Sequence, residues 1–508
     1  MKTEKEGLVL FNGRIYTQDQ NRPRVSAVAI LGNRIVDWGR DNIRSRYPSD
    51  RYAAINLKQK TVLPGFCDSH THFLGYLHTL DRLNLEKSKS LEDALRRISQ
   101  YVKGKKPDEW ILGYNWDANL WKDSPSPDEN HLDRISARHP MAFSSKDGHQ
   151  LWVNSAALKT AGITFKTDGI LKENSRQKIF QAIPLSENDK TAQRAFRNLH
   201  RKGITSIHNM ENGASLEFFR RLEIDRRLPL RVWQTISKDG LDQAIRDGLK
   251  TGHGSDYLKI GGLKLFADGA LGSRTALMFQ PYETDRKNRG VENLTRPEMQ
   301  KLVKKASQSG ISAVIHAIGD RANFNALMAL KNNGSNDRLR HRIEHAQLVR
   351  PRDLELFSHQ NIIASCQPVH CPGDFKMALE HWGVRHENAY PLKSLLSKKV
   401  KLCFGSDFPL YDFDPILGIH SAVNRAFPKS RNSAWNPSQK ITVAQAVTAY
   451  TANAAFAAGW ERDLGTLAPG KLADMVVLSD DIHRLPPEKL DQTKVITTIF
   501  DGKVVYGE

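Results

Sequence analysis

The sequence predicts an α/β fold in which a (β/α)8 barrel is joined to a small β-domain built from both ends of the chain. Three observations favour this fold. Strand-like segments stand at both ends of the 508 residues, short apolar runs alternate with helix-period segments between them, and polar side chains follow several of those runs. The first predicts the β-domain, the second a parallel sheet with helical crossovers, and the third an active face where the strands end.

The two ends of the chain have the same strand-like pattern. Val and Ile partly alternate with polar residues in GLVLFNGRIYT and AVAILGNRIVDWG, and Asn-Gly and Gly-Asn pairs mark turns. The C-terminal segments ADMVVLSDD and VITTIFDGKVVYGE repeat the pattern. We therefore expect residues 1–62 and 460–508 to form one β-domain together.

The middle of the chain, residues 63–459, alternates between two kinds of segment. Apolar runs end at Phe66, Phe143, His208, Phe266, His316, His345, Gln367 and Gly405. Helix-period segments such as TRPEMQKLVKKASQSG, RANFNALMALKNNG and PLKSLLSKK lie between most of them. Eight strands with helical crossovers predict a (β/α)8 barrel. The intervals near 84–140 and 163–189 are too long for simple crossovers, so we expect insertions there that cover the barrel mouth.

Composition and charge narrow the classes of partner. The formal net charge is +19, but Lys and Arg are spread along the chain without a basic tail or a nucleic-acid motif. This pattern favours a solvated basic surface or attraction of anionic substrates, and it leaves nucleic-acid binding as an alternative.

The N-terminus lacks a secretory signal, and no apolar run is long enough to span a bilayer. Four cysteines are too few for a disulfide framework, so we expect a cytoplasmic protein with reduced thiols.

Side chains that could bind a metal end five of the predicted strands. They are His70 and His72, Lys264, His316, His345 and Asp407. A single histidine at a strand end is usually structural, but six such groups at the same end of a barrel indicate a metal centre. His70 and His72 share one face of their strand, so both can reach one ion. Imidazole and carboxylate ligands favour a divalent cation such as zinc.

Lys264 is the unusual member of this set, because an ammonium cannot bind a cation. One interpretation is an ion-paired lysine. The other is a desolvated, neutral Lys264 that reacts with carbon dioxide, giving a carbamate whose oxygens can bridge two metals. Lys259 lies an odd number of positions earlier, so we expect it to face away from Lys264 in a regular strand.

Several motifs resemble the amidohydrolase superfamily over nearly the whole chain. LPGFCDSHTH resembles its Pro-Gly-x-x-Asp-x-His-x-His signature, GSDFP its last-strand aspartate, and LGTLAPGKLADMVVLSDD its return into a composite β-sandwich. KDGHQLWVNSAAL, KLFADGALGSRTA, HAIGDRA, RIEHAQ and TAYTANAAFAAG resemble the YtcJ-like branch, which is similar to N-substituted formamide deformylases and AepA-like proteins.

This resemblance implies a divalent metal, usually zinc, in a distorted (β/α)8 barrel with a composite β-sandwich. It implies one or two ions. His70 and His72 would bind one metal, and His316 and His345 a second. A carbamylated Lys264 would lie between them, and Asp407 would lie at the catalytic metal.

Five further residues are weaker candidates for substrate contacts: His149, Trp152, Asp268, Asp320 and His370. His149 enters through the resemblance, and its alternative is a structural turn with a capping aspartate. Trp152 could line an apolar pocket or simply pack in a core. Asp268 could orient Lys264. Asp320 could hold His316 or begin the next helix, and His370 follows the seventh predicted strand.

The predicted reaction is hydrolysis of a non-peptide carbon–nitrogen bond, such as an N-substituted formamide or a cyclic amide, by a metal-activated water. Asp407 would accept the proton of the water and return it to the leaving nitrogen, unless it is a turn or helix-cap aspartate. The same centre could instead hydrolyse esters, lactones or phosphoesters, or catalyse an isomerisation. A non-enzymatic regulatory protein would be expected to lack a metal ligand, and none is missing.

We expect a small-molecule amide substrate and neither a specific nucleic-acid partner nor a membrane. A homodimer is left open.

Overall fold

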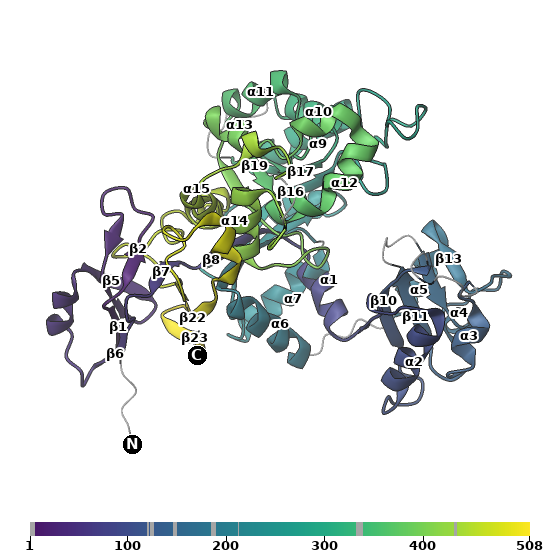
Figure 1. Ribbon diagram of the computed structural model, residues 1–508, viewed down its shortest axis with the longest axis horizontal. Coiled ribbons are helices and arrows are strands. Elements are labelled where there is room, and N and C mark those ends of the chain that lie inside the picture. The colour runs from purple at the N-terminus through teal and green to yellow at the C-terminus, as the bar shows by residue number, and fades with distance from the viewer. Residues whose placement is uncertain are drawn as a thin grey trace. The chain divides into compact units, whose positions relative to one another are not determined.

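The computed structural model describes residues 6–118, 121, 126–145, 150–183, 189–211, 213–331, 339–430 and 434–507. The chain divides into two units (Figure 1). Unit 1 holds Met1–Phe73 and Phe196–Glu508, and unit 2 holds Leu74–Ala195. The insertions expected near 84–140 and 163–189 lie within unit 2. Among the described helices, none combines the length and the apolar character that crossing a bilayer requires.

Unit 1 contains the barrel, an eight-stranded parallel sheet. Its strands in spatial order are β8 (Phe66–Thr71), β14 (Ile204–Asn209), β15 (Arg231–Ser237), β16 (Leu258–Phe266), β17 (Ala313–Ala317), β18 (Arg342–His345), β19 (Ile363–Cys366) and β20 (Leu402–Phe404). The first and last strands meet near their carboxyl ends, where the amide of Asp407, just after β20, donates to the carbonyl of His70 on β8 at 2.8 Å. A Cβ at Gly405 would lie 2.4 Å from the His70 nitrogen, so only glycine allows this approach. The predicted distorted barrel is confirmed.

Helices connect the barrel strands. They are α7 (Gly213–Ile224), α8 (Leu241–Arg246), α9 (Arg296–Gln308), α10 (Asp320–Leu330), α11 (Leu354–His359), α12 (Cys371–Trp382) and α13 (Leu392–Ser397), followed by α14 (Pro415–Asn424), α15 (Val443–Tyr450) and α16 (Ala452–Ala457). The three helices predicted from period are confirmed as α9, α10 and α13. Thr295 begins α9 with a capping box, in which its side chain accepts from the Glu298 amide and Glu298 reaches back.

One predicted barrel strand is wrong. The apolar run that ends at Phe143 forms β11, which pairs within unit 2, and the barrel takes β15 instead. A short apolar run indicates a buried strand but does not say to which sheet it belongs. The β15 segment, RVWQTIS, carries Arg231 and Gln234 among its apolar residues, and both polar side chains are buried through polar contacts that sequence periodicity does not reveal.

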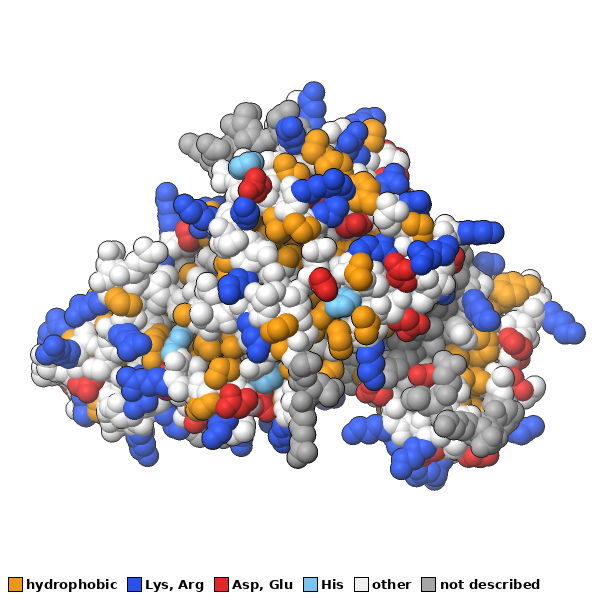
Figure 2. All heavy atoms as spheres, turned by 45° about the horizontal axis from the view of Figure 1, so that its top comes forward, with side chains coloured by type: hydrophobic (Ala, Val, Ile, Leu, Met, Phe, Trp, Pro, Cys, Tyr) orange, Lys and Arg blue, Asp and Glu red, His pale blue; other side chains and the backbone are white. Residues whose placement is uncertain are grey.

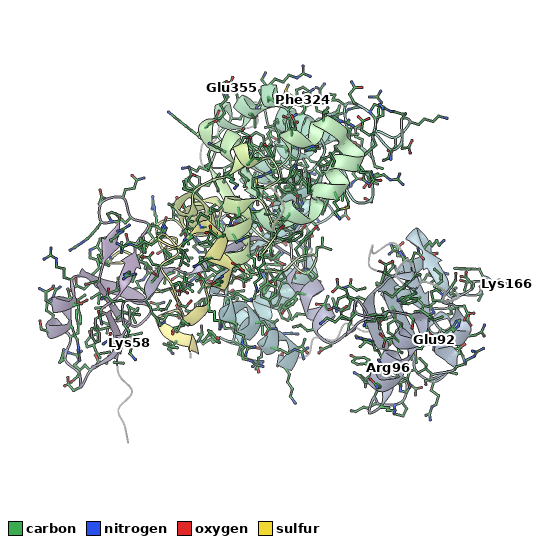
Figure 3. The ribbon with its side chains drawn as sticks, viewed as in Figure 1. Lys58, Glu92, Arg96, Lys166, Phe324 and Glu355 are labelled. Atoms are coloured by element: carbon green, nitrogen blue, oxygen red, sulfur yellow. The ribbon has the colours of Figure 1, made fainter. Side chains whose placement is uncertain are left out.

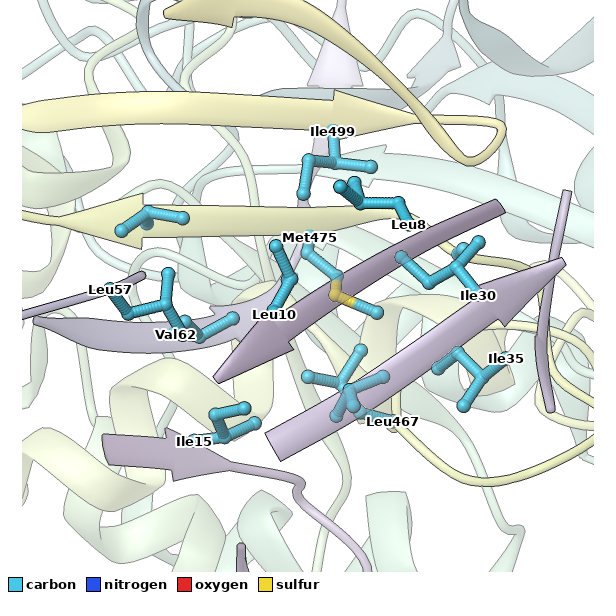
Figure 4. Packing of buried hydrophobic residues seen from close by; sticks show 13 residues of the cluster. Leu8, Leu10, Ile15, Ile30, Ile35, Leu57, Val62, Leu467, Met475 and Ile499 are labelled. Carbon is cyan, nitrogen blue, oxygen red and sulfur yellow. The ribbon is translucent and has the colours of Figure 1, made fainter. Parts of the chain in front are cut away.

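Both ends of the chain form two further sheets of unit 1. One has the order β5 (Arg34–Gly39), β4 (Ala27–Leu31), β1 (Gly7–Phe11), β6 (Tyr52–Asn56). The other has the order β23 (Lys503–Gly507), β22 (Val495–Phe500), β21 (Met475–Leu478), β7 (Thr61–Pro64), β2 (Arg14–Tyr16), β3 (Arg24–Val25). Leu10 and Ile30 of the first sheet and Val62, Met475 and Ile499 of the second belong to one buried cluster (Figure 4). Burial of these apolar side chains holds the chain ends together.

Unit 2 is built on a five-stranded sheet. Its order is β13 (Ile170–Lys172), β12 (Gln150–Val153), β11 (Met141–Ser145), β10 (Ile111–Trp116), β9 (Leu83–Asn84), and its helices are α2 (Leu91–Val102), α3 (Glu129–Asp133), α4 (Ser155–Thr160) and α5 (Gln177–Ala182). Helices α1 (Phe73–Leu80) and α6 (Asp189–Arg201) contain the points where the chain passes between units. In α2, Leu91, Ala94 and Ile98 recur at helical spacing and are buried. Glu92 and Arg96, labelled in Figure 3, lie on its exposed side.

The basic charge is distributed over the surface. Lys and Arg side chains are scattered among acidic, apolar and other side chains on the face shown in Figure 2. This agrees with the even spread of these residues along the sequence.

A buried ion pair joins the barrel to the C-terminal sheet. Arg231 on β15 is fully buried, and its Nε and Nη2 donate to the two oxygens of Asp474 at 2.8 and 2.9 Å. Nη2 also donates to Asp501 at 3.1 Å. Burial alone would lower the pKa of Arg231, but the nearby Asp474 carboxylate raises it above its ordinary value. The guanidinium therefore stays charged inside the protein and depends on its partners.

Asp474→Ala is expected to lower the free energy of unfolding by about 3–5 kcal/mol, because it leaves a buried charge without its main partner. Equilibrium urea denaturation of wild type and variant measures this loss. Asp242→Ala is the control, because Asp242 pairs with Lys305 at an exposed site and such pairs contribute little to stability. Equal stability losses in the two variants would contradict the assigned role of Asp474.

Candidate metal centre

Three candidate ligands converge where the barrel strands end. His70 lies on β8, His345 is the last residue of β18, and Asp407 follows β20. One ligand atom of each lies within 4.8 Å of the other two, and all three residues are buried. The distance from His70 Nε2 to Asp407 Oδ1 is 3.5 Å. These groups come from strands far apart in sequence, and the closed barrel brings them together.

The backbone at two of these residues adopts a conformation that non-glycine residues rarely take. His345 has a φ of 69° and Asp407 a φ of 61°. Each left-handed residue costs about 1–3 kcal/mol, so such residues persist only where the surrounding structure holds them. The bond from the Asp407 amide to the His70 carbonyl is one such restraint. This backbone places both ligands at the barrel mouth.

The other three predicted ligands surround this group. Nε2 of His72 lies 3.2 Å from Asp407 Oδ1. The His316 ring lies 4.5 Å from the His345 ring between centroids, and its Nε2 contacts the Gly269 carbonyl at 3.0 Å. Nζ of Lys264 is buried and has no hydrogen-bond partner among the described residues. The structure therefore brings all six predicted residues to one end of the barrel.

Burial keeps three histidines of the site, His70, His316 and His345, neutral. Burial, helped by the Lys264 charge, lowers the pKa of His70 to about 4 and that of His316 to about 3. The pKa of His345 also lies well below its ordinary value, first because of burial and then because of neighbouring His316. Neutral imidazole is the form that binds metals.

Asp407 is ionised in the same place. Burial raises the pKa of Asp407, but the neighbouring His70 and His72 oppose this effect and outweigh it. The pKa therefore lies well below the ordinary aspartate value. The carboxylate oxygen thus faces imidazole nitrogens in a buried site. This donor set fits a divalent cation, because a lone pair on His70 Nε2 and an anionic oxygen would otherwise face each other at 3.5 Å. Nζ of Lys264, which has no hydrogen-bond partner among the described residues, is a second buried polar group of the site that needs a partner.

Glu344, which contacts the His70 ring, was not among the predicted site residues. Nδ1 of His70 lies 2.5 Å from Glu344 Oε2, and both residues are buried. Glu344 immediately precedes the candidate ligand His345. A signal was present in the strand RIEH, because Arg342 and Glu344 lie two residues apart and therefore share one face of a predicted barrel strand. Two opposite charges on a buried face indicate a buried pair.

Asp68 of the DSHTH stretch was also missed. Its Oδ1 accepts from the amides of His70 and Ser406 at 3.2 and 2.9 Å, and its Oδ2 accepts from the Ser406 hydroxyl at 2.5 Å. Burial raises the pKa of Asp68 to about 7, although these hydrogen bonds oppose the rise. Asp68 thus ties the first barrel strand to the loop after the last strand, where Asp407 lies.

The weaker candidates have different places. Asp268 accepts from the amides of Leu277, Ile318 and Gly319, and its Oδ1 lies 3.6 Å from His316 Nε2, so it shapes the loops beside His316. Burial raises the pKa of Asp268 to about 7. His370 Nε2 donates to the Ser406 carbonyl at 2.9 Å, next to Asp407.

Two of the weaker candidates have structural contacts instead. Asp320 begins α10 and accepts from the Phe279 amide at 2.9 Å, which agrees with the alternative that it begins the next helix. Trp152 is fully buried in the core of unit 2, and its Nε1 donates to the Asp128 carbonyl. This agrees with the alternative that Trp152 packs in a core. His149 lies outside the described residues.

A pocket of about 450 Å³ opens beside Lys264. Its apolar lining includes Met210, Phe266 and Leu294, and its charged lining includes Glu211 and Asp239. The pocket is of the size that holds small molecules, and it reaches the candidate metal centre at Lys264.

Comparison with known proteins identifies the family. The amidohydrolase family matches residues 53–506. The protein LONG AFTER FAR-RED 3 of Arabidopsis thaliana is 30% identical over 98% of this chain and 91% of its own length. YtcJ of Bacillus subtilis (strain 168) is 28% identical over 97% and 98%. N-substituted formamide deformylase of Arthrobacter pascens is 24% identical over 99% of both chains.

A solved structure agrees with these relatives. The crystal structure of an uncharacterized metal-dependent hydrolase from Pyrococcus horikoshii OT3 has a TM-score of 0.83 and 27% identity, covering 95% of this chain and 99% of that chain. The match spans the barrel, the sheets formed by both chain ends, and unit 2. The chain therefore belongs to the amidohydrolase family, and within it to the YtcJ-like branch.

Proposed function

We propose that this hydrolase cleaves a carbon–nitrogen bond in a small, non-peptide amide. The observation that carries the proposal is the convergence of His70, His345 and the ionised Asp407 within 4.8 Å at the barrel mouth. A formamide deformylase among the relatives supports the choice of bond. A zinc ion held by these groups would acidify a water molecule and polarise the substrate carbonyl.

Asp407 is the proton carrier of the proposed reaction. Its carboxylate is ionised, so it can accept a proton from the attacking water. It can then return that proton to the leaving nitrogen, which departs poorly as an amide anion. Esters need this second step less, because an alkoxide is a better leaving group. The position of one buried carboxylate beside the neutral imidazoles of His70 and His345 thus suits amide cleavage.

Lys264 is proposed to carry a carbamate. Burial lowers the pKa of its amine to about 8, although Glu344 and Asp407 oppose the shift. The unprotonated Nζ would attack the carbon of carbon dioxide, form a nitrogen–carbon bond and release one proton. The resulting anion supplies oxygen donors in place of an amine that has no partner among the described residues. His72, beside Asp407, and His316, beside His345, would then be further ligands of the metal centre.

The pocket beside Lys264 is the proposed site for the rest of the substrate. Phe266, Met210 and Leu294 offer apolar surface, so an amide with an apolar substituent suits it. The exposed fraction of Phe266 is 45%, and a bound substituent would cover this ring.

A substrate panel tests the proposal. Zinc-loaded protein is incubated with N-formyl amines, cyclic amides and aryl esters, and amine release and ester cleavage are measured. We expect at least one amide class to be hydrolysed, with loss of activity after zinc is removed by a chelator and recovery after zinc is added. Activity confined to esters would contradict amide hydrolysis and would favour the ester or lactone reaction.

A further inference from the structure

A buried ion pair lies directly beneath the candidate metal centre. Glu344 on β18 is fully buried, and its Oε2 lies 2.5 Å from Nδ1 of His70 on β8. Arg342, two residues earlier on the same strand, is also fully buried and donates through Nε to Glu344 Oε1 at 2.5 Å. The carboxylate thus bridges a guanidinium and an imidazole inside the barrel.

Arg342 is held from several strands. Its Nη2 donates to the Ser69 carbonyl at 2.6 Å, to the Ser365 hydroxyl at 2.8 Å and to Glu344 Oε2 at 3.3 Å. Its Nη1 donates to His208 Nδ1 at 2.8 Å. Strands β8, β14, β18 and β19 therefore all contribute to the position of one guanidinium. A carboxylate fixed by such a group has little freedom to rotate away from His70.

The contact with Glu344 decides what His70 can offer a metal. An ionised carboxylate only accepts hydrogen bonds, so Nδ1 of His70 must carry the proton. Its Nε2 then has a free lone pair, and this nitrogen lies 3.5 Å from Asp407 Oδ1. His316 is supported differently, since its ring contacts the neutral carbonyl of Gly269. Of the two, His70 has the shorter contact with a carboxylate, at 2.5 Å against 3.6 Å from His316 Nε2 to Asp268 Oδ1, and such support makes an imidazole a stronger ligand.

We propose that Glu344, anchored by Arg342, is a positioning residue that fixes the tautomer and ring orientation of His70 and so tightens divalent metal binding. The proposal rests on the proposed function only in taking His70 as a metal ligand. It adds a layer beneath the ligands, in which the charge of Arg342 balances that of Glu344 within the barrel.

Zinc affinity of the full-length protein tests this role without any substrate. Metal-free protein is titrated with Zn²⁺ in competition with a fluorescent chelator at one fixed pH. Arg342→Met with Glu344→Leu removes both charges together, which avoids leaving an unpaired buried charge. We expect this double variant to keep a melting temperature near that of the wild type and to bind zinc about 10–100-fold more weakly.

A second variant, Glu344→Asp, tests the same role if the double variant does not fold. Glu344→Asp keeps the charge that balances Arg342 but withdraws the carboxylate from His70 by about one carbon–carbon bond. We expect weaker zinc binding here as well, by about 10-fold, since second-layer partners contribute about 10–100-fold to metal affinity.

The matched control is a buried ion pair elsewhere in unit 1. Arg231→Met with Asp474→Leu removes the pair between the barrel and the C-terminal sheet and leaves the candidate ligands untouched. Its zinc affinity should equal that of the wild type, even if its melting temperature falls.

Two results would overturn the proposal. One is wild-type zinc affinity in a folded Arg342→Met/Glu344→Leu or Glu344→Asp variant. The other is an equal loss of affinity in the control, which would make the effect one of general stability. Absence of amide hydrolysis in the wild type would remove the proposed function, but the measured difference in zinc affinity would stand.

Discussion

Asp407→Asn is expected to slow amide hydrolysis by about 10²–10⁴-fold while most of the bound zinc is retained. The amide of asparagine keeps an oxygen that can bind a metal, but it cannot take a proton from water at neutral pH. In the wild type, His70 and His72 hold the pKa of Asp407 well below its ordinary value, against the effect of burial, so the acceptor form is present. Loss of that form removes proton transfer and leaves the site assembled.

The measurement compares turnover and zinc content of the variant with those of the wild type. Asp481→Asn is the matched control, because Asp481 is a buried aspartate that accepts from the Tyr16 hydroxyl, away from the barrel mouth. It should leave the rate unchanged. An Asp407→Asn protein that keeps a rate close to that of the wild type would show that Asp407 does not carry the proton.

Lys264→Ala is expected to abolish most of the activity, and short carboxylic acids such as acetate or propionate should restore part of it. Removal of the side chain empties a buried space next to Phe266, whose ring centroid lies 4.9 Å from Nζ. A small carboxylate can occupy that space and supply the oxygens of the proposed carbamate. Rates are measured with increasing acid concentration at constant pH and ionic strength.

Lys259→Ala is the control for this experiment. Lys259 lies on the same strand, but its Nζ donates to the Gly459 carbonyl at 3.3 Å and lies over the Trp460 ring, away from the site. We expect it to keep its activity and to show no response to carboxylic acids. A zinc-loaded structure with one ion and an unmodified Lys264 would contradict the bridging carbamate.

Much of the barrel could be predicted because each strand and helix carries a local pattern. Helix α9 shows this best, since Thr295 and Glu298 form a capping box at the predicted start of an amphipathic segment. The assignment of Phe143 to the barrel failed for the opposite reason. Its apolar run is a genuine strand, but strand pairing depends on contacts distant in sequence, and periodicity contains none of them.

The partners of buried polar residues, like strand pairing, could not be predicted from sequence periodicity. Strand β15 was absent from the predicted barrel strands. It carries the buried Arg231, whose partners Asp474 and Asp501 come from the far end of the chain. Trp152 and Asp320 looked like substrate contacts because of their residue type and position. In the structure, Trp152 is packed in a core, and Asp320 accepts a hydrogen bond from the Phe279 amide.

The sequence by itself determined the family and the fold class, and it predicted the candidate metal ligands, because ligand types at strand ends are a local property of each strand. The tertiary structure decided which of those ligands meet, and it added the support beneath them. His70, His345 and Asp407 converge only because the barrel closes between β8 and β20. The role of Glu344 beside His70 became visible only when β18 was placed across from β8, since this contact joins two strands that are far apart in sequence.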